Sequence, residues 1–454
     1  MLTHQFAKFV YETDYDAFPD DVIQEAKERI LDTLGAAFAG AKLWEYTEEY
    51  LRACRLMGSG DSGVLFHEKK EFSVPQAAMI NSAFAHVIEL DDGHKNAGVH
   101  CGAAVVMTAL TLGNALGSSG KEILTAVVLG YDLVYRLAAN MAPYQIQKGF
   151  HPSGNDDTIG VMAVAGKLLK LNEEQLANGF GMAALYSAGL MEATVNGQQS
   201  KCIQVGNAAW NGLAAAYYAK ENIVGTVSAF EGKSGFFHAK SCDVDLEKVC
   251  EDLGKKFVIR DTYNKLYPTC RHSQPAIESV IMLCEENKIN YHDVKEVHVG
   301  TYQVAYDLTG TIKRPKNAGD AKFSTPYGAA VALREKSFGI RHLEDRYIFD
   351  KELVELAQKV TVEVDDSVQA LYPKRRGAKV QITLNDGQKF ETECFDLKGS
   401  PANPIGWPEL LTKFTENAIG SFKKETVDQM AAVISVLEKE ETISTLMELT
   451  EQWG

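Results

Sequence analysis

Apolar side chains recur at helical spacing through most of the first 260 residues. The segments with this spacing are residues 20–41, 75–87, 103–116, 121–141, 158–171, 173–187 and 206–219. An amphipathic helix places its apolar residues three and four apart in this way. Many of these segments are rich in Ala and Gly, whose small side chains let helix axes approach closely. The pattern predicts a compact bundle made of helices.

The periodicity changes from helical to alternating near Leu266. Apolar and polar residues alternate, as they do in half-buried strands, over residues 294–301, 359–364, 378–384 and 389–395. The last two of these segments flank Asn385-Asp386-Gly387, which is typical of a hairpin turn. Helical spacing returns between the strands at residues 274–287 and 327–334. This region is therefore predicted to be a mixed α+β unit of ordinary domain size.

These regions predict a mainly α protein with an insertion. We expect a large all-helical domain over residues 1–262 and a smaller α+β lid domain over residues 263–403. Helical spacing resumes at Pro408, so residues 404–454 are expected to pack back on the first domain. The cleft between the two domains is then the default place for a site.

Composition narrows the classes of partner. The formal net charge of −15 at pH 7 argues against nucleic acid or an anionic membrane surface. The first ten residues lack the pattern of a secretory signal, and no apolar run reaches the ~20 residues that span a bilayer. The eight cysteines form no C-x-x-C pair, so a zinc ribbon or thioredoxin-type motif is not indicated. We expect a cytoplasmic protein with reduced thiols.

Several well-known motifs are missing. No G-x-G-x-x-G follows a predicted strand, and neither H-E-x-x-H nor G-x-S-x-G occurs. Gly117-Ser118-Ser119-Gly120-Lys121 is only loosely similar to a phosphate-binding loop, and we interpret it as the turn that starts a helix. Dinucleotide, ATP and serine-triad mechanisms therefore have no support in the sequence.

The densest group of ionisable residues is Glu89-Leu90-Asp91-Asp92-Gly93-His94-Lys95, with His100 close behind. Mostly apolar segments, residues 77–88 and 103–116, bound it on both sides. Buried ionisable groups need partners, and groups with perturbed pKa values are what proton-transfer chemistry uses. Two alternatives are a solvated surface loop and a metal site formed by Asp91, Asp92, His94 and His100, although the spacing matches no defined metal motif.

Other chemical groups lie farther along the chain. His151 precedes Pro152, which biases it toward an extended conformation. Lys201 lies near a helix start, where the helix dipole disfavours a cation, so a role in binding a carboxylate is indicated. The junction segment contains Lys265, Tyr267, Arg271 and His272, and a polar approach to a helix ends at Tyr327. The alternatives are a turn, a surface lysine, a solvated basic junction and a plain helix cap.

Lys374-Arg375-Arg376 is a basic run next to a predicted strand, and a solvated face is its favoured interpretation. Taken together, the other groups supply several imidazoles, several cations and a pair of carboxylates. That set suits proton transfer next to a carboxylate, in which cations hold the substrate and an imidazole or a carboxylate moves the proton.

The order of these pieces resembles the MmgE/PrpD family over nearly the whole chain. The matching pieces are Asp32-Thr33-Leu34-Gly35, His86-x-x-Glu89-Leu90-Asp91-Asp92-Gly93-His94, His100-x-Gly102-Ala103-Ala104, Gly149-Phe150-His151-Pro152-Ser153-Gly154, Lys201 with Gly206-Asn207-Ala208-Ala209, Tyr267-Pro268-x-Cys270-Arg271-His272, Phe323-Ser324-x-Pro326-Tyr327, and Asn403-Pro404 with Lys413-Phe414. Each piece is short, and their shared order carries the resemblance.

The resemblance implies a fold and a chemistry. The family includes 2-methylcitrate dehydratase, cis-aconitate decarboxylase and iminodisuccinate epimerase, and its fold is a helical domain with an inserted α+β lid. It implies a homodimer that needs no metal or organic cofactor and acts on small di- or tricarboxylic acids. The candidate catalytic residues are Asp91, Asp92, His94, His100 and His151. The candidate substrate-binding residues are Lys95, Lys201, Lys265, Tyr267, Arg271, His272 and Tyr327.

The chain departs from the decarboxylase and dehydratase branches, which carry Asp-Asp-Thr where it has Asp92-Gly93-His94. Cys101 follows His100, and Gln204 replaces a family His. The Gly-His-Lys form is closer to the epimerase-like branch. The hypothesis is a cofactor-independent isomerase or lyase that removes a proton α to a carboxylate, as an epimerase or a dehydratase. The alternatives are a cis-aconitate-type decarboxylase, a non-catalytic carboxylate-binding homologue and a metal hydrolase.

Overall fold

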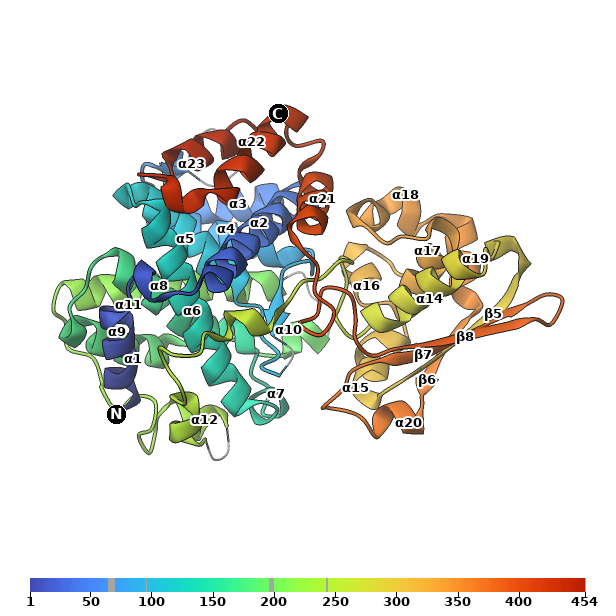
Figure 1. Cartoon of the computed structure of the whole chain (residues 1–454), viewed down its shortest axis with the longest axis horizontal. Helices are drawn as coiled ribbons and strands as arrows, with labels where there is room; N and C mark the ends of the chain where they lie inside the picture. Colours follow the sequence, from blue (N-terminus) through green and yellow to red (C-terminus); the bar gives the residue numbers. More distant parts are fainter. Residues whose placement is uncertain (64–69, 95, 196–199, 242–243, 454) are drawn as a thin grey trace.

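The computed structural model describes residues 1–63, 70–94, 96–195, 200–241 and 244–453. Two large hydrophobic cores and one small cluster, of Tyr302, Ala305 and Val368, organise these residues. Figure 1 shows the corresponding parts, a larger helical one and a smaller one that contains a sheet. We call the first the helical body and the second the α+β module. The fold class is thus confirmed as mainly α with a mixed α+β region.

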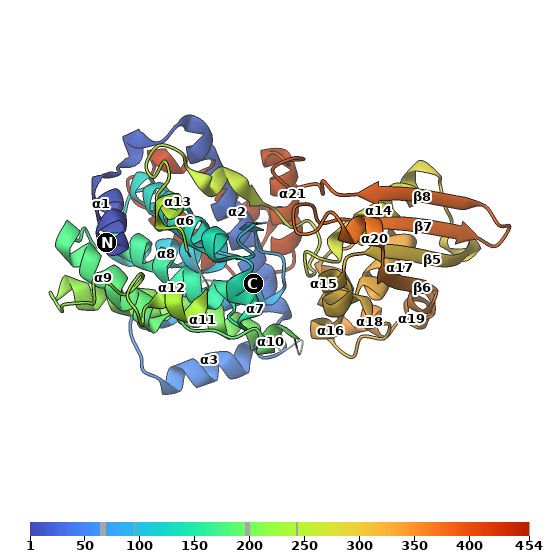
Figure 2. The same cartoon turned by 90° about the horizontal axis from the view of Figure 1, so that it is seen from below.

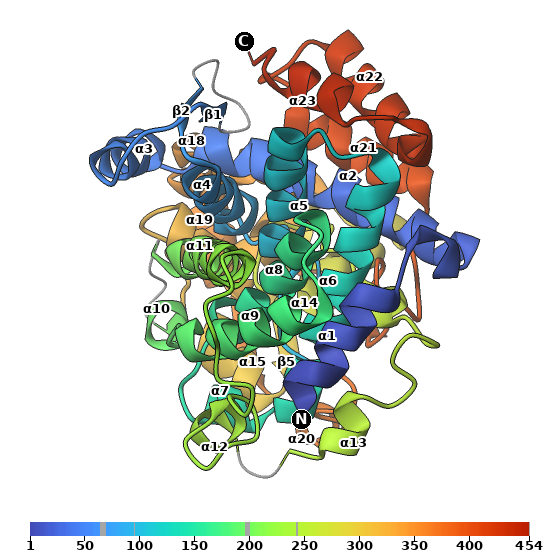
Figure 3. The same ribbon diagram turned by 90° about the vertical axis from the view of Figure 1, so that its left-hand side faces the viewer.

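The helical body uses both ends of the chain. Its N-terminal helices are α1 (Leu2–Glu12), α2 (Asp20–Leu43), α3 (Thr47–Leu56), α4 (Val74–Val87), α5 (Gly102–Leu116), α6 (Gly120–Met141), α7 (Tyr144–Gln147), α8 (Pro152–Leu168), α9 (Glu173–Tyr186), α10 (Glu192–Val195), α11 (Lys201–Lys220), α12 (Phe236–Lys240) and α13 (Leu246–Val249). The C-terminal helices α21 (Trp407–Ala418), α22 (Lys424–Ser435) and α23 (Ser444–Thr450) share its core. Figures 1 and 3 show them lying over α2 and α5.

Local signals in the sequence explain where these helices begin. Gly117 ends α5 with a φ of +67°, a left-handed conformation that glycine adopts without strain. Ser119 then caps α6, accepting a hydrogen bond from the Glu122 amide while the Glu122 carboxylate accepts one from the Ser119 amide. This reciprocal capping box satisfies amides that the helix cannot pair. The interpretation of this glycine-rich run as a helix-start turn is confirmed.

The α+β module is built on one mixed sheet. Its elements are α14 (Gln274–Glu286), β5 (Val294–Thr301), α15 (Gln303–Ala305), α16 (Ala318–Lys322), α17 (Thr325–Glu335), α18 (Asp345–Ile348), α19 (Lys351–Gln358), β6 (Val360–Val364), α20 (Asp366–Gln369), β7 (Ala378–Leu384) and β8 (Lys389–Cys394). Figure 2 shows the strands side by side in the order β6-β5-β7-β8. The β5–β6 pair is parallel and the other two pairs are antiparallel. Helices α14, α17 and α19 pack on the sheet.

The chain crosses twice between the helical body and the α+β module. On the outward path β4 (Thr262–Tyr263) leads to Asn264, and on the return path the chain passes Gly399. The Asn264 amide donates a hydrogen bond of 2.7 Å to the Gly399 carbonyl, so the two paths lie side by side. Gly399 has a φ of +84°, and a Cβ there would lie 2.7 Å from the Asn264 carbonyl oxygen. Only glycine allows this close approach.

The structure corrects three details of the sequence prediction. Helix α8 begins at Pro152 rather than at residue 158, and α11 begins at Lys201 rather than at residue 206. Polar side chains that are buried in these first turns hid the apolar periodicity. Two short strand pairs, β1–β2 and β3–β4, also interrupt the helical part of the chain. Among the described residues, no helix combines the length and hydrophobicity needed to cross a membrane.

Candidate functional site

The segment that connects α4 and α5 carries the ionisable cluster to the junction between the two parts. It includes β3 (Gly93–His94), which pairs antiparallel with β4 so that Gly93 faces Tyr263. A Cβ at Gly93 would lie 2.5 Å from the Tyr263 hydroxyl oxygen, so the pairing requires glycine there. Glu89 has a φ of +56°, which is unfavourable for a side chain of this size. Strain of this kind gathers at functional sites, where the surroundings enforce it.

Glu89 holds two lysines from different parts of the chain. Its carboxylate is 4% exposed and accepts hydrogen bonds from the ammonium groups of Lys201 and Lys265, the latter at 3.2 Å. Burial alone raises the pKa of Glu89, but Lys201 and Lys265 outweigh it and hold this pKa well below its ordinary value. Burial lowers the pKa of Lys265, but Glu89 and Asp91 outweigh that effect and raise it. Glu89 and Lys265 are therefore arranged to stay charged.

Asp91 is paired with an imidazole. Its Oδ2 lies 2.6 Å from Nδ1 of His86, and its Oδ1 lies 3.8 Å from the Lys265 ammonium. Asp91 and His86 are almost fully buried. The Nε2 atom of His86 has no hydrogen-bond partner among the described residues. A carboxylate that binds Nδ1–H orients the ring and leaves Nε2 as the proton acceptor.

His100 and His151 complete a group of three imidazoles around His86. The ring centroids lie 5.4 Å from His86 for His100 and 6.1 Å for His151. Nδ1 of His100 lies 2.6 Å from the Asp92 carbonyl oxygen. A carbonyl only accepts hydrogen bonds, so Nδ1 carries the proton and Nε2 is left with its lone pair. Nδ1 of His151 is buried without a hydrogen-bond partner among the described residues.

All three imidazoles are held in the neutral form. Burial, and after it the nearby lysines, lowers the pKa of His86 and of His100 well below the ordinary value of 6.5. Burial and Lys201 do the same for His151, although Glu89 and a side-chain hydrogen bond with Gln204 raise its pKa. Neutral imidazoles beside fixed ammonium groups can accept a proton from a substrate that the ammonium groups hold.

Asp92 faces away from this group, toward a buried support. It accepts hydrogen bonds from the Tyr131 hydroxyl (2.5 Å) and the Gly102 amide (3.3 Å), and it lies 4.0 Å from Arg29. Burial raises the pKa of Asp92 to about 7, although Arg29 lowers it. These contacts fix the backbone carbonyl that orients His100. Asp92 is thus placed to position the site.

Lysines of the C-terminal helices and of the α+β module also bind the backbone at the end of α4 and in the segment that follows it. The Lys413 ammonium of α21 donates to the Leu90 carbonyl at 2.9 Å and pairs with Asp32 at 2.5 Å. The Lys322 ammonium of α16 donates to the Val87 carbonyl at 2.6 Å. Both ammonium groups are buried. The positions of the catalytic candidates therefore depend on segments far apart in the sequence.

The structure gathers Asp91, His100, His151, Lys201 and Lys265 from the sequence-predicted set. Arg271 and His272 lie beside this group: the Arg271 guanidinium carbon is 4.3 Å from the Tyr263 ring centroid, and Nδ1 of His272 is hydrogen bonded to the Tyr302 hydroxyl. The Tyr263 ring centroid is also 6.4 Å from that of His100, so this ring lies close to both Arg271 and His100.

Other predicted residues lie elsewhere. The His94 ring packs 4.5 Å from the Tyr135 ring, and burial lowers its pKa to about 4. Tyr267 packs against the core of the α+β module. The Tyr327 hydroxyl donates to the His342 carbonyl inside that core, so the structure does not bring it to the buried group. Lys95 lies outside the described residues.

Sequence reasoning missed three residues of this site as candidates: His86, Glu89 and Lys322. The first two belong to the motif that carried the family resemblance, and their spacing from Asp91 was the available signal. Lys322 lies in the polar approach to α17, where the helix-cap interpretation also holds, because Ser324 accepts a hydrogen bond from the Tyr327 amide. Nothing in the sequence around Lys322 indicated that its ammonium group would donate to the distant Val87 carbonyl.

A cavity of about 290 Å³ lies at the junction of the two parts, next to the buried group. Its lining includes His94 and Tyr263 from the helical body and Arg271 and Arg376 from the α+β module. The basic run at residues 374–376 is therefore only partly a solvated face. Lys374 and Arg375 are exposed, but Arg376 is half-buried at the cavity.

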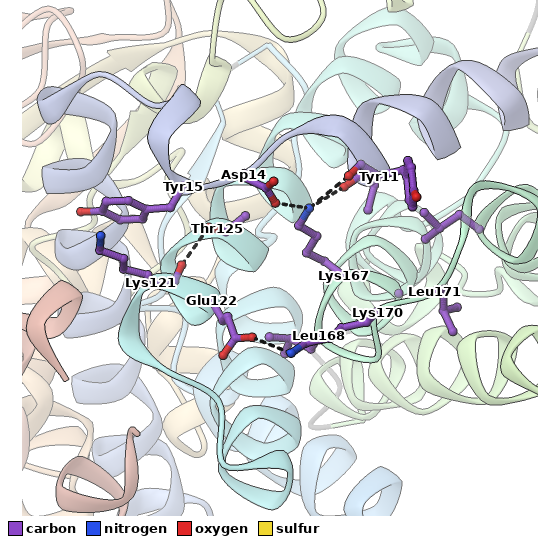
Figure 4. Close-up of a pocket in the computed structure, with 13 residues that line it drawn as sticks. Tyr11, Asp14, Tyr15, Lys121, Glu122, Thr125, Lys167, Leu168, Lys170 and Leu171 are labelled. Atoms are coloured by element: carbon purple, nitrogen blue, oxygen red, sulfur yellow. Dashed lines mark hydrogen bonds and ion pairs between the residues drawn. The ribbon is translucent and has the colours of Figure 1, made fainter. Parts of the chain in front are cut away.

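A second cavity, of about 370 Å³, lies between α1, α6 and α8 (Figure 4). The Lys167 ammonium there donates to backbone carbonyls at the end of α1 and to Asp14, and Lys170 pairs with Glu122 at 3.3 Å. These charges satisfy one another, and the imidazole group lies elsewhere. Within the described residues, no group of three or more His, Cys, Asp or Glu side chains has the arrangement of a metal site.

Comparison with known proteins agrees with this architecture. The MmgE/PrpD N-terminal domain matches residues 4–248 and the MmgE/PrpD C-terminal domain matches residues 267–439. A cis-aconitate decarboxylase of Aspergillus terreus is 25% identical and covers 99% of this chain and 95% of its own length. The mouse enzyme of that name is 24% identical over 99% of this chain and 93% of its own, and the human one is 25% identical over 99% and 94%.

Proposed function

The chain belongs to the MmgE/PrpD family, and on this premise we propose that it is an isomerase or lyase for small di- or tricarboxylic acids. The reaction would start with removal of a proton from the carbon α to a carboxylate. The chain's own side chains would carry this chemistry, without a cofactor. Epimerisation and dehydration share this first step.

The observation that carries the proposal is a set of neutral imidazoles beside fixed ammonium groups. His100 presents Nε2 as a proton acceptor, because its Nδ1 is bound to a carbonyl oxygen. Lys265 lies within 3.8 Å of Asp91 and 3.2 Å of Glu89, so its charge is fixed at the same place. A base next to cations lowers the cost of forming an anion on a carboxylic acid.

In the proposed reaction, His100 Nε2 takes the α-proton and the electron pair of the C–H bond moves into the adjacent carboxylate. The resulting enediolate is stabilised by Lys201 and Lys265. His151 then passes its ring proton to the opposite face, which gives the epimer, and its other nitrogen is reprotonated from solvent, to which His100 returns the proton it removed. Alternatively the His151 proton, replaced from solvent in the same way, goes to a β-hydroxyl group, which leaves as water while the electron pair of the enediolate forms a C=C bond. The Asp91–His86 pair would assist as a second base.

Decarboxylation is a second candidate, and the names of the relatives favour it. In that reaction the C–C bond to a carboxylate breaks, CO₂ leaves, and an imidazole donates a proton to the carbanion that remains. The same cations and imidazoles would serve. Gln204, which takes the place of a family His and contacts His151, favours the epimerase-like assignment instead.

Deuterium exchange tests the proposal. The protein is incubated in heavy water with a panel of saturated di- and tricarboxylic acids, and α-deuterium incorporation is followed by mass spectrometry. His100→Gln should slow exchange by a factor of about 10²–10⁴. His298→Gln is the matched control, because His298 is an exposed imidazole of β5 paired with Glu363. Its exchange rate should equal that of the wild type.

Two outcomes would count against the proposal. One is a wild-type protein that exchanges no α-hydrogen in the panel. The other is exchange that His100→Gln leaves unchanged. If wild-type protein instead releases CO₂ from cis-aconitate and exchanges none of the saturated acids, decarboxylation replaces proton abstraction as the assigned reaction.

We also propose that the chain forms a homodimer. Support comes from exposed aromatic side chains at the ends of α9 and α11, where the rings of Tyr186 and Tyr218 lie 6.4 Å apart. The neighbouring Leu185 is 57% exposed. Exposed apolar side chains that lie together mark association surfaces more often than isolated ones do. Sedimentation equilibrium gives the mass directly, and a monomer at micromolar concentration would contradict the prediction.

A further inference from the structure

The cavity at the junction is lined by two guanidinium groups that form no ion pair with a described carboxylate. Arg271 comes from the segment before α14, and Arg376 from the segment before β7. The Arg271 guanidinium donates only to neutral oxygens, the Asn264 carbonyl (3.3 Å) and the Gln274 amide oxygen (2.8 Å). Nε of Arg376 is buried without a hydrogen-bond partner among the described residues.

Neither guanidinium forms an ion pair with a described carboxylate within 4.0 Å. Asp396 lines the same cavity but is bound by Arg375 at 2.8 Å, and the other acidic lining residue is Asp261. Burial lowers the pKa of Arg271; the Tyr263 hydroxyl and the Glu278 carboxylate raise it, and the nearby Arg376 adds a smaller lowering. Two half-buried or buried guanidinium groups that lack a direct ion pair are costly to keep in one cavity, and a bound carboxylate would relieve the cost.

The cavity is connected to the proposed reaction centre through Tyr263. The centroid of this ring lies 4.3 Å from the Arg271 guanidinium carbon and 6.4 Å from the centroid of the His100 ring. The cavity volume of about 290 Å³ is large enough for a small organic acid. A ligand in the cavity could therefore reach from the arginines toward the imidazoles.

We propose that this cavity binds a second carboxylate of the substrate, and that Arg376 determines the preference for di- and tricarboxylates over monocarboxylates. The inference rests on the proposed function for the identity of the substrate. Its own content is a binding site in which Arg271 and Arg376 take one carboxylate while Lys201 and Lys265 take the carboxylate next to the reacting carbon. The planar fork of a guanidinium suits such a group.

Calorimetric titration of three probes tests the site: butyrate with one carboxylate, succinate with two and tricarballylate with three. Arg376→Gln should weaken succinate and tricarballylate binding about tenfold or more, since charge-assisted hydrogen bonds are lost, and butyrate binding by less than about twofold. Arg376→Lys keeps the charge without the fork and should fall between wild type and Arg376→Gln. Lys374→Gln is the matched control, because it removes a cation from an exposed position two residues away.

The inference is overturned if Arg376→Gln leaves succinate and tricarballylate affinities within about twofold of wild type, or weakens all three probes equally. It is also overturned if Lys374→Gln gives the same loss, since the effect is then one of net charge. If Arg376→Gln does not fold, the comparison of Arg376→Lys with Lys374→Gln decides by the same criteria. If the wild type exchanges no deuterium, the proposed reaction is wrong. A selective loss of succinate and tricarballylate binding in the Arg376 variants would still support the binding site.

Discussion

Replacing Glu89 by Gln removes the single negative charge that two buried lysines share. Gln matches Glu in size and has a similar cost at the left-handed φ of +56°, so the substitution isolates the charge. After the change, the ammonium groups of Lys201 and Lys265 face a neutral amide. Asp91, at 3.8 Å from Lys265, is the nearest remaining carboxylate of the described ion pairs.

The size of the effect follows from the geometry. At 3.2 Å, the attraction between Glu89 and Lys265 is about 5 kcal/mol for an effective dielectric constant near 20. Desolvation of the charges opposes this attraction in the wild type, so the pair itself adds little net stability. Removing one partner leaves the other charge buried and uncompensated, which typically costs about 3–5 kcal/mol. We therefore expect Glu89→Gln to lower the free energy of unfolding by about 3–5 kcal/mol.

Urea unfolding followed by circular dichroism at pH 7 measures this loss. Glu355→Gln is the control, because Glu355 is an exposed acid on α19. Glu89 has a depressed pKa, so its contribution is present above the ordinary carboxyl value of 4.5 and is lost as pH falls below it. The difference between wild type and Glu89→Gln should shrink accordingly in acid. A loss at pH 7 within about 1 kcal/mol of that of the control would refute the reasoning.

Three further predictions test other parts of the site. Burial, with neighbouring acids, raises the pKa of Asp157 well above its ordinary value of 3.8, and neither of its oxygens has a described hydrogen-bond partner. In urea titrations the wild type should therefore lose stability relative to Asp157→Asn as pH rises above about 4. A stability difference that stays constant with pH would contradict this. Gly93→Ala would place a Cβ 2.5 Å from the Tyr263 hydroxyl oxygen, so succinate affinity in calorimetry should fall at least about tenfold, whereas unchanged affinity would show that the ring position is irrelevant. Lys413→Met leaves the buried Asp32 carboxylate without its ammonium partner and should lower the free energy of unfolding in urea by about 3–5 kcal/mol. The exposed Lys424→Met should lower it by less than about 0.5 kcal/mol. Equal losses would argue against a buried pair.

The fold was predictable from the sequence wherever burial follows a regular period. Helices α5 and α6 and strands β5 and β7 begin and end within a residue of their predicted bounds, because the two helices are largely apolar and buried on nearly every side and the two strands place their branched apolar residues on a core. The first turn of α8 was not predictable in this way. Asp156 and Asp157 lie there, fully buried but polar, and a periodicity argument reads buried polar residues as exposed.

The sequence indicated which residues gather at the site but not which of them form ion pairs and hydrogen bonds with one another. The charge density around Asp91 marked the loop, and its apolar flanks indicated burial. The sequence could not show that Lys201 and Lys265 share Glu89, since these residues are more than one hundred positions apart and meet only in the folded chain. His94 was a reasonable candidate by spacing, yet the strand pairing with β4 places its ring against Tyr135, away from the three imidazoles.

The contacts that fix the loop also bear on how a substrate enters. Lys322, from the α+β module, donates its buried ammonium to the Val87 carbonyl at the end of α4, and Lys265 lies on the crossing path between the two parts. Moving the whole α+β module away from the helical body would break the Lys322 hydrogen bond. The ammonium group would then be left without its acceptor, which costs several kcal/mol for a buried charge. The cavity beside Tyr263 already lies at the junction and needs only side-chain displacement. Entry past Arg376 and Arg271 is therefore the less costly route, and it would select anionic substrates before they reach the imidazoles.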